Sequence, residues 1–320
     1  MFPIILYGLK NCDKEYRFRV LSGKRHTYYR VTYEHHCSLD HDIMAVYDNF
    51  YKSLNPFDPQ SVISKVNKNE NVVLDDVFIR TFGLSMNLAG KTGGVFDPTC
   101  APLINLWGFG YEKIDEAIDD IKKYVGYNKI KIEEGRVIKT DPRMQLNFSA
   151  IGDGFACEII GRCLDEKGVK NYMVDIGGEI IVKGKNRTGI DWSVGIIKPP
   201  KYPGVNEPSG FEAILHLKGR SSLATSGNYN NFRIRNGKRY GHAINPLTGY
   251  PTNNGILSAT VIAPDCVTAD AYATAIMSVE KDKLDKLLQT CHLLEYYIIY
   301  KDNADNYHVK LSDGMRVYTR

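Results

Sequence analysis

Several patterns that assign a chain to a common class are absent from these 320 residues. No stretch approaches the roughly 20 apolar residues that a membrane-spanning helix needs. No long run of Lys or Arg accompanies the net charge of +4, so nucleic acid is not a required partner, whereas an anionic small ligand is compatible with this charge. The seven cysteines include no Cys-x-x-Cys pair, which argues against a thioredoxin-like motif or a zinc site, and we expect most of them to be buried.

Other absences concern the organisation of the chain. No Gly-x-Gly-x-x-Gly follows a predicted strand, which disfavours the usual dinucleotide-binding fingerprint. No internal repeat or low-complexity linker divides the sequence, so we expect one continuous fold. With 43% hydrophobic and 24% charged residues, the chain has the composition of a globular protein with a large core.

The N-terminal segment, residues 1–24, allows two interpretations. Met1 to Cys12 reads MFPIILYGLKNC, a short apolar piece before a cysteine without a positively charged region ahead of it. It is either the remnant of a lipoprotein signal, with a possible lipid anchor to a membrane, or an edge strand or disordered end. Residues 25–320 form the main domain in both cases.

Hydrophobic periodicity predicts helices and strands without the regular alternation of a Rossmann domain, which favours the α+β class. An early strand is predicted over residues 28–33. Helices are predicted near residues 41–54, 75–89, 114–125, 268–278 and 282–288, and from the end of the Gly152–Gly154 turn to about residue 168. After residue 177 strands dominate, and residues 294–300 and 307–311 are expected to form a closing hairpin.

The first segment with chemical potential is Gly93–Thr99, followed by Leu103–Gly110. Paired glycines allow the backbone to approach a ligand closely, and Asp97 beside aromatic residues could bond the polar edge of a ring. The alternative is a glycine-rich turn packed with aromatic residues.

The second segment is Asn147–Phe155, where a strand is expected to pass through glycines into a helix. A helix N-terminus presents free backbone N–H groups, which suit a phosphate. A Gly-x-Gly at such a turn is common, so a purely structural turn remains open.

The third segment joins Leu223–Tyr229 to Tyr240–Pro251. Its small hydroxyl residues and glycine suit a loop that bonds phosphate or ribose, and His242 precedes an Asn-Pro-x-Thr-Gly turn. A structural histidine and a tight turn are the alternative.

The fourth segment is Thr268–Ala275. Asp270 and Thr274 stand one helical turn apart, so a carboxylate and a hydroxyl share one helix face. Hard oxygen ligands of this kind suit Mg²⁺. The alternative is a helix capped by Thr268 or Asp270.

The order and wording of these segments closely resemble the ApbE family of FAD:protein FMN transferases, over about residues 25 to 280. The matching words are Asn55–Asn67, Gly94–Thr99 with the Asn-Leu-Trp-Gly-Phe-Gly run, the Asn147–Phe155 segment, the Thr225 and His242 segments, and Thr268–Ala275. The resemblance implies a single large domain of mixed, mainly antiparallel sheets with flanking helices and a T-fold-like core.

The resemblance also implies ligands and roles. FAD would be the substrate, with Asp97 holding its head, Phe57 stacking on a ring, and the diphosphate lying near Asp153, Thr225 and His242. The implied FAD-binding set is Phe57, Val95, Phe96, Asp97, Asp153, Thr225, Ser226, Gly227 and His242. The implied Mg²⁺ ligands are Asp270, Thr274 and the carbonyl of Ala150, and the implied catalytic residues are His242 and Asp270.

Three positions depart from the family pattern. Arg25-His26-Thr27 stands for Met-Gly-Thr, Asp153 for a common Lys, and Asn245 for the usual Asp before Pro-x-Thr-Gly. Asn245 matters most, because an amide is neither a base nor a charged ligand.

The implied activity is Mg²⁺-dependent transfer of FMN from FAD to a Thr or Ser hydroxyl of an acceptor respiratory flavoprotein, with release of AMP. The alternatives are an FAD pyrophosphatase that yields FMN and AMP, and a non-catalytic FAD-binding protein. The resemblance further implies an extracytoplasmic location at the periplasmic face of the inner membrane.

Overall fold

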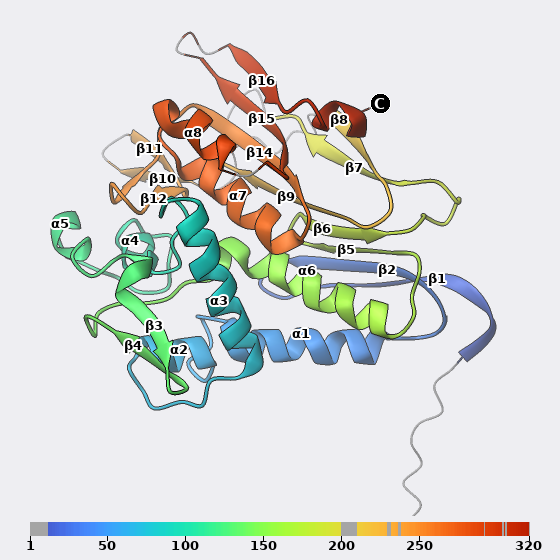
Figure 1. Cartoon of the computed structure of the whole chain (residues 1–320), viewed down its shortest axis with the longest axis horizontal. Coiled ribbons are helices and arrows are strands. Elements are labelled where there is room, and N and C mark those ends of the chain that lie inside the picture. Colours follow the sequence, from blue (N-terminus) through green and yellow to red (C-terminus); the bar gives the residue numbers. More distant parts are fainter. Residues whose placement is uncertain are drawn as a thin grey trace, which may run out of the picture.

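An antiparallel sheet of eight strands organises the chain, and the computed structural model describes residues 12–199, 210–228, 232–235, 238–290, 292–302, 304 and 306–319 (Figure 1). The strand order is β1-β2-β5-β6-β9-β14-β15-β16, and every neighbouring pair is antiparallel. The strands are β1 Cys12–Lys24, β2 Tyr28–Cys37, β5 Tyr172–Ile176, β6 Glu179–Lys183, β9 Ser221–Gly227, β14 Ile256–Ala263, β15 Glu295–Lys301 and β16 Tyr307–Leu311.

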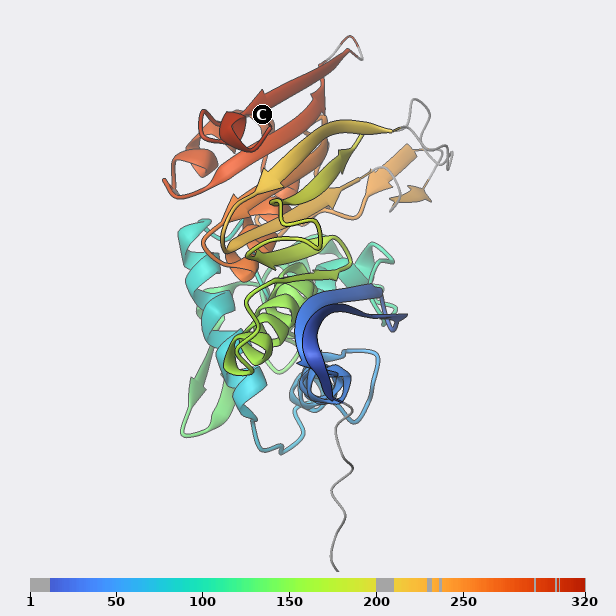
Figure 2. The ribbon, with the colours of Figure 1, turned by 90° about the vertical axis from the view of Figure 1, so that its right-hand side faces the viewer.

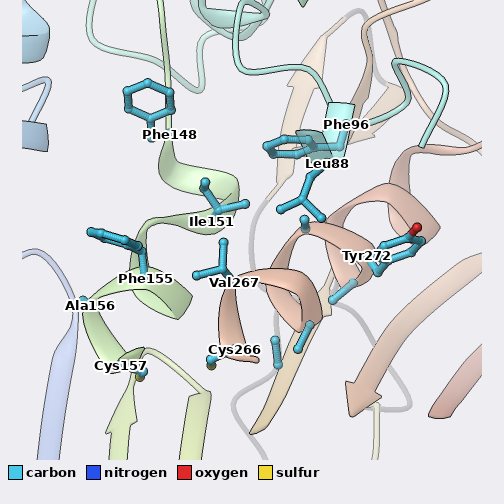
Figure 3. Close-up of a cluster of buried hydrophobic side chains, with 14 of the residues drawn as sticks. Leu88, Phe96, Phe148, Ile151, Phe155, Ala156, Cys157, Cys266, Val267 and Tyr272 are labelled. Atoms are coloured by element: carbon cyan, nitrogen blue, oxygen red, sulfur yellow. The ribbon is translucent and has the colours of Figure 1, made fainter. Parts of the chain in front are cut away.

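Helices cover one face of this sheet. They are α1 Asp40–Leu54, α3 Asp76–Lys91, α6 Ser149–Glu166 and α7 Cys266–Ser278. Figure 2 shows the helices and the sheet from the side. Because successive strand residues face opposite sides, Val174 of β5 and Val261 of β14 join the helix-side core. Figure 3 shows this core where α6 and α7 meet, with Ile151, Phe155 and Val267 between them.

The opposite face carries a smaller core under a β-hairpin. The hairpin consists of β7 Trp192–Ile197 and β8 Phe211–Leu217, and the short helix α9 Met315–Tyr318 lies beside it. Ile180 and Leu223 of the sheet share this core with Trp192 and Leu215 of the hairpin. Both faces of the central strands are therefore buried, which fixes their register.

Smaller elements connect this framework. The helical ones are α2 Val62–Asn67, α4 Ala101–Leu106, α5 Ile118–Ile121, α8 Leu284–Gln289 and the 3₁₀ turns η1 Tyr127–Lys129 and η2 Lys281–Lys283. The extended ones are the pairs β3 Ile130–Glu133 with β4 Arg136–Lys139, β10 Phe232–Arg235 with β11 Lys238–Gly241, and β12 Ile244–Asn245 with β13 Tyr250–Pro251. No helix in the described ranges has the length and apolarity to cross a membrane.

The predicted α+β class, the antiparallel sheet and the closing hairpin of β15 and β16 are confirmed. The lipoprotein interpretation of the first 11 residues lies outside the described residues, whereas Cys12–Lys24 is an edge strand. The predicted helix over residues 114–125 is wrong, because only Ile118–Ile121 is helical. The Lys129 ammonium donates to the carbonyls of Lys122, Lys123 and Val125, which satisfies these groups without further helical turns.

The predicted glycine turn before α6 is also wrong. α6 begins at Ser149, so Gly152 and Gly154 lie inside its first turns. A Cβ atom at Gly154 would lie 2.6 Å from the carbonyl oxygen of Cys266. Gly154 therefore allows a close approach of α6 to α7, and it is not a break between strand and helix.

Candidate active site

A cavity of about 550 Å³ lies at the N-terminal end of α6 and beside the middle of α7. Its size falls within the range of small-molecule sites. Its wall consists of His26, Phe50, Tyr51, Leu54, Asn55, Pro56, Phe57, Cys100, Ile104, Phe109, Gly110, Tyr111, Asn147, Phe148, Ser149, Ala150, Gly152, Asp153, Gly177, Glu179, Thr225, Ser226, Gly227, His242, Ala243, Ile244, Asp270, Thr274, Met277 and Ser278. No Lys or Arg belongs to this wall within the described chain.

The cavity brings together most of the residues that the sequence singles out. Those on its wall are Phe57, Ala150, Asp153, Thr225, Ser226, Gly227, His242, Asp270 and Thr274. They come from segments spread over more than 200 positions of the chain. Val95, Phe96 and Asp97 are not on the wall.

The carboxylate of Asp97 is engaged by the protein itself. Its Oδ1 accepts hydrogen bonds from the backbone N–H and the hydroxyl of Thr99, at 2.8 and 2.6 Å. Its Oδ2 accepts from the backbone N–H of Tyr127 at 2.8 Å. Val95 and Phe96 are buried in the helix-side core, and Figure 3 shows Phe96 there. The structure thus does not bring this segment to the cavity, and Asp97 joins the turn after α3 to η1.

Three buried or half-buried acids face the cavity. Asp270 is 5% exposed and Glu179 7% exposed, and Asp153 stands near both. A Cβ atom at Gly177 would lie 2.8 Å from Oδ2 of Asp153 and 3.2 Å from Oε2 of Glu179, so these two carboxylates crowd the same glycine. Glu179 was not singled out from the sequence, although its position after Gly177-Gly178 at the start of a strand was a usable signal.

Burial and mutual repulsion disfavour the charged forms of these acids. Burial raises the pKa of Asp153 to about 6. Burial and then the Asp153 charge raise the pKa of Asp270. The pKa of Glu179 is raised by burial and then by the charges of Asp270 and Asp153. A bound cation would relieve this cost, since like charges in a poorly solvated place destabilise one another.

The helix α7 places the oxygens expected to bind metal. Asp265 caps its N-terminus by accepting from the backbone N–H and the hydroxyl of Thr268, at 2.7 and 2.8 Å. Asp270 is therefore not the cap, and it faces the cavity together with Thr274. The Oδ2 of Asp270 accepts from the backbone N–H of Gly154 at 3.1 Å, which fixes the carboxylate beside the first turn of α6.

The Thr225 segment is a strand end rather than the expected loop. Thr225, Ser226 and Gly227 close β9, and the Thr225 hydroxyl bonds the hydroxyl of Thr260 on β14 at 2.9 Å. Ser226 and Gly227 are half-buried and reach the cavity wall. Their polar groups come from a rigid sheet, which holds them in place better than a loop would.

Asn245 shapes a turn outside the main cavity. Its Oδ1 accepts from the backbone N–H of Leu247 at 2.9 Å, and its carbonyl accepts from the N–H of Gly249 at 2.8 Å. Gly249 adopts a φ of 83°, a conformation that glycine favours. The amide at position 245 therefore serves the Pro246–Gly249 turn.

An aromatic rim borders the opening. Phe57 is 55% exposed; the ring of His26 stacks on it at 5.1 Å, and Tyr111 meets it edge-on at 6.0 Å. Asn67 holds the Tyr111 hydroxyl at 2.9 Å and also bonds the backbone of Leu146. His26 and Tyr111 complete the rim and were not predicted as ligand contacts.

A second group of potential metal ligands lies away from this cavity. Ligand atoms of His35, His36 and Cys37 fall within 4.8 Å of one another at the end of β2. Cys37 is disulfide-bonded, so its sulfur is not a thiolate ligand in this state. None of the three residues lines the cavity.

The fold and the acid-lined cavity are those of an α+β domain with a small-molecule site. Comparison of the chain with known proteins identifies its family. The ApbE family model matches residues 26–298, and the chain belongs to this family. The FAD:protein FMN transferase of Haemophilus influenzae is 32% identical over 319 residues, which cover 93% of this chain and 91% of that protein. The FAD:protein FMN transferase of Escherichia coli K12 is 32% identical over 67% of this chain and 62% of its own length.

Solved structures of the same family resemble this chain. The flavin transferase ApbE from Vibrio cholerae superposes with a TM-score of 0.81 at 28% identity, over 95% of this chain and 100% of that chain. The apo flavinyl transferase ApbE of Pseudomonas stutzeri, at 24% identity and a TM-score of 0.82, supports the fold.

Proposed function

We propose that this chain is an FAD:protein FMN transferase that moves FMN from FAD to a Thr or Ser hydroxyl of an acceptor flavoprotein and releases AMP. One observation carries the proposal: a single cavity gathers an exposed aromatic ring, strand-end hydroxyls, a histidine, the buried Asp270 and the half-buried Thr274. The names of the relatives supply the reaction class.

Mg²⁺ dependence is part of the proposal, and the residues present fit this ion. Asp270, Thr274 and Ala150 all line the same cavity, and a carboxylate, a hydroxyl and a backbone carbonyl are the kind of hard oxygen ligands that Mg²⁺ prefers. A diphosphate needs positive charge, and the described wall offers no Lys or Arg for it. When bound, the ion would neutralise the diphosphate and stabilise charge on the leaving AMP.

The residues of the chain then have separate tasks. Phe57 offers a face for a flavin ring, and Ser226 and Gly227 border the path of the diphosphate. The acceptor hydroxyl attacks the FMN phosphorus, a new P–O bond forms, and the P–O bond to AMP breaks. His242 lines the cavity and is placed to accept the proton of the attacking hydroxyl or to stabilise charge.

Location is a further part of the proposal. An extracytoplasmic site of action, at the face where respiratory flavoproteins expose their acceptor domains, agrees with the disulfide at Cys37, because disulfides persist in oxidising compartments.

The test is incubation with FAD, Mg²⁺ and a flavin-free subunit of a respiratory flavoprotein. Covalent flavin on the subunit supports transfer. Free FMN without labelled subunit would instead identify an FAD pyrophosphatase, and unchanged FAD would identify a binding protein. Omission of the subunit measures the hydrolytic background.

A further inference from the structure

Trp107 joins two distant parts of the chain without touching the cavity. It follows α4 directly, is 7% exposed, and does not belong to the cavity wall. Its indole N–H donates to the carbonyl of Gly249 at 2.9 Å in a buried hydrogen bond. Its ring packs against Tyr240 at 5.0 Å and Tyr250 at 5.9 Å.

These contacts lie on both sides of His242 in the chain. Tyr240 precedes the histidine by two residues, and Gly249 and Tyr250 close the turn that follows it. A Cβ atom at Gly249 would lie 2.4 Å from Cγ2 of Ile118, so the turn is seated tightly on its support. The segment that carries His242 is therefore held at two points by one indole ring.

Phe109, two residues after Trp107, contacts the histidine itself. The two rings meet edge to face, with centroids 6.4 Å apart and planes at 66°, and both line the cavity. The guanidinium of Arg233 lies 5.1 Å from the Phe109 ring centroid, and its Nε donates to the carbonyl of Gly108 at 3.2 Å. The β10–β11 pair is thus fastened to the same loop.

We infer that Trp107 is a positioning residue for His242, and that Phe109 is the contact through which the loop orients the imidazole. This inference rests on the role proposed above for His242. The aromatic residues of the Leu103–Gly110 segment would then serve the histidine rather than the flavin ring. A displacement of about 1 Å at a reacting group can cost about a hundredfold in rate, so a remote anchor of this kind has a measurable effect.

The first test replaces Trp107 by phenylalanine, which keeps a ring and removes the indole N–H. We expect the single-turnover rate of flavin transfer at saturating FAD to fall about tenfold, with the KM for FAD changed less than about twofold. Trp192→Phe is the matched control, because the Trp192 indole also donates to a backbone carbonyl, that of Lys183 at 3.1 Å, on the opposite face of the sheet. This control should leave the rate unchanged.

The second test repeats Trp107→Phe in a His242→Ala background. A positioning effect disappears when the positioned group is absent, so the second substitution should not lower the residual rate further. An equal fall in both backgrounds would show a merely structural role and overturn the inference. So would an unchanged rate in the otherwise native chain.

Two further controls separate the possible failures. If Trp107→Phe does not fold, Tyr250→Leu removes one packing contact from a side chain that is 53% exposed, and the same comparison in both backgrounds applies. If His242→Ala transfers flavin at the full rate, the inference is overturned while covalent labelling of the acceptor still supports the transferase itself.

Discussion

The carboxylate of Asp270 on α7 accepts a hydrogen bond from the backbone N–H of Gly154 on α6. This bond links the tight contact between α6 and α7 at Gly154 to the carboxylate that we propose as a Mg²⁺ ligand. Because both helices are packed into the helix-side core, the position of the carboxylate depends on how tightly α6 and α7 pack.

Gly154→Ala should destabilise the protein and weaken metal binding. The added Cβ would lie 2.6 Å from the Cys266 carbonyl oxygen and 3.0 Å from Cβ of Asp270, so the helices must separate. Overpacking of this kind costs about 1–3 kcal/mol. Denaturant unfolding measures it, and Gly152→Ala is the control, because its nearest neighbour is Phe50 at 3.7 Å. Equal stability of the two variants would contradict the packing argument.

The metal-free protein should lose stability as the pH rises from about 4 to about 6. The folded-state pKa of Asp153 is raised to about 6 by burial, above the value of about 3.9 in an unfolded chain. The folded state therefore binds more protons than the unfolded state in this window, and its free energy of unfolding falls by up to about 3 kcal/mol. Unfolding in EDTA should show a smaller fall for Asp153→Asn. A pH slope equal to that of the native chain would refute the assignment.

Phe57 and Asp97 should respond differently to substitution. Phe57→Ala removes an exposed ring at the cavity, so FAD affinity should weaken about tenfold, since aromatic contact and burial together contribute 1–2 kcal/mol or more. Asp97→Asn should lower stability by about 1–3 kcal/mol, because an amide N–H would face the N–H of Tyr127. Fluorescence titration of FAD and thermal unfolding separate the two effects. A large loss of FAD affinity in a stable Asp97→Asn protein would show that Asp97 contacts FAD.

Asn245→Asp should change the rate of flavin transfer less than about threefold. The side-chain oxygen that accepts from Leu247 is present in both residues, and Asn and Asp serve such turns about equally. A residue acting as a general base would instead contribute about 10²- to 10⁴-fold. Single-turnover transfer by both proteins measures the difference, and a tenfold rise would show that position 245 takes part in the chemistry.

The fold was largely predictable from local patterns. β-branched and aromatic residues identified the early strand, and the Asp75 and Gly93-Gly94 signals placed α3 within two residues of its observed ends. Gly152 and Gly154 misled, because a glycine required by helix packing looks in the sequence like a glycine required by a turn. Residues 114–125 were predicted as a helix because their apolar residues recur at helical spacing. In the structure these apolar residues pack into the core from a mostly irregular chain, and only Ile118–Ile121 is helical.

The candidate site was predictable where local spacing alone brings side chains together. Asp270 and Thr274 are one turn apart on α7, and both line the cavity. The sequence could not show whether Asp97 bonds a ligand or the protein itself, because its backbone partner Tyr127 lies 30 positions away. Tyr111 was missed for a similar reason, because its position at the cavity depends on its hydrogen bond with Asn67, which lies 44 positions away. Glu179 had a local signal in the Gly177-Gly178 pair before its strand, but its approach to Asp153 depends on the fold.

The most direct test of the account is a single-turnover flavin transfer with Mg²⁺ or EDTA, for the native chain and Asp270→Asn. In-gel flavin fluorescence of a flavin-free acceptor subunit follows the product, and an acceptor with alanine at its target hydroxyl is the control. The account predicts covalent flavin only for the native chain with Mg²⁺, and a signal for Asp270→Asn at least about a hundredfold weaker, because the metal stabilises the transition state more than bound FAD. Full labelling in EDTA, or by Asp270→Asn, would contradict it.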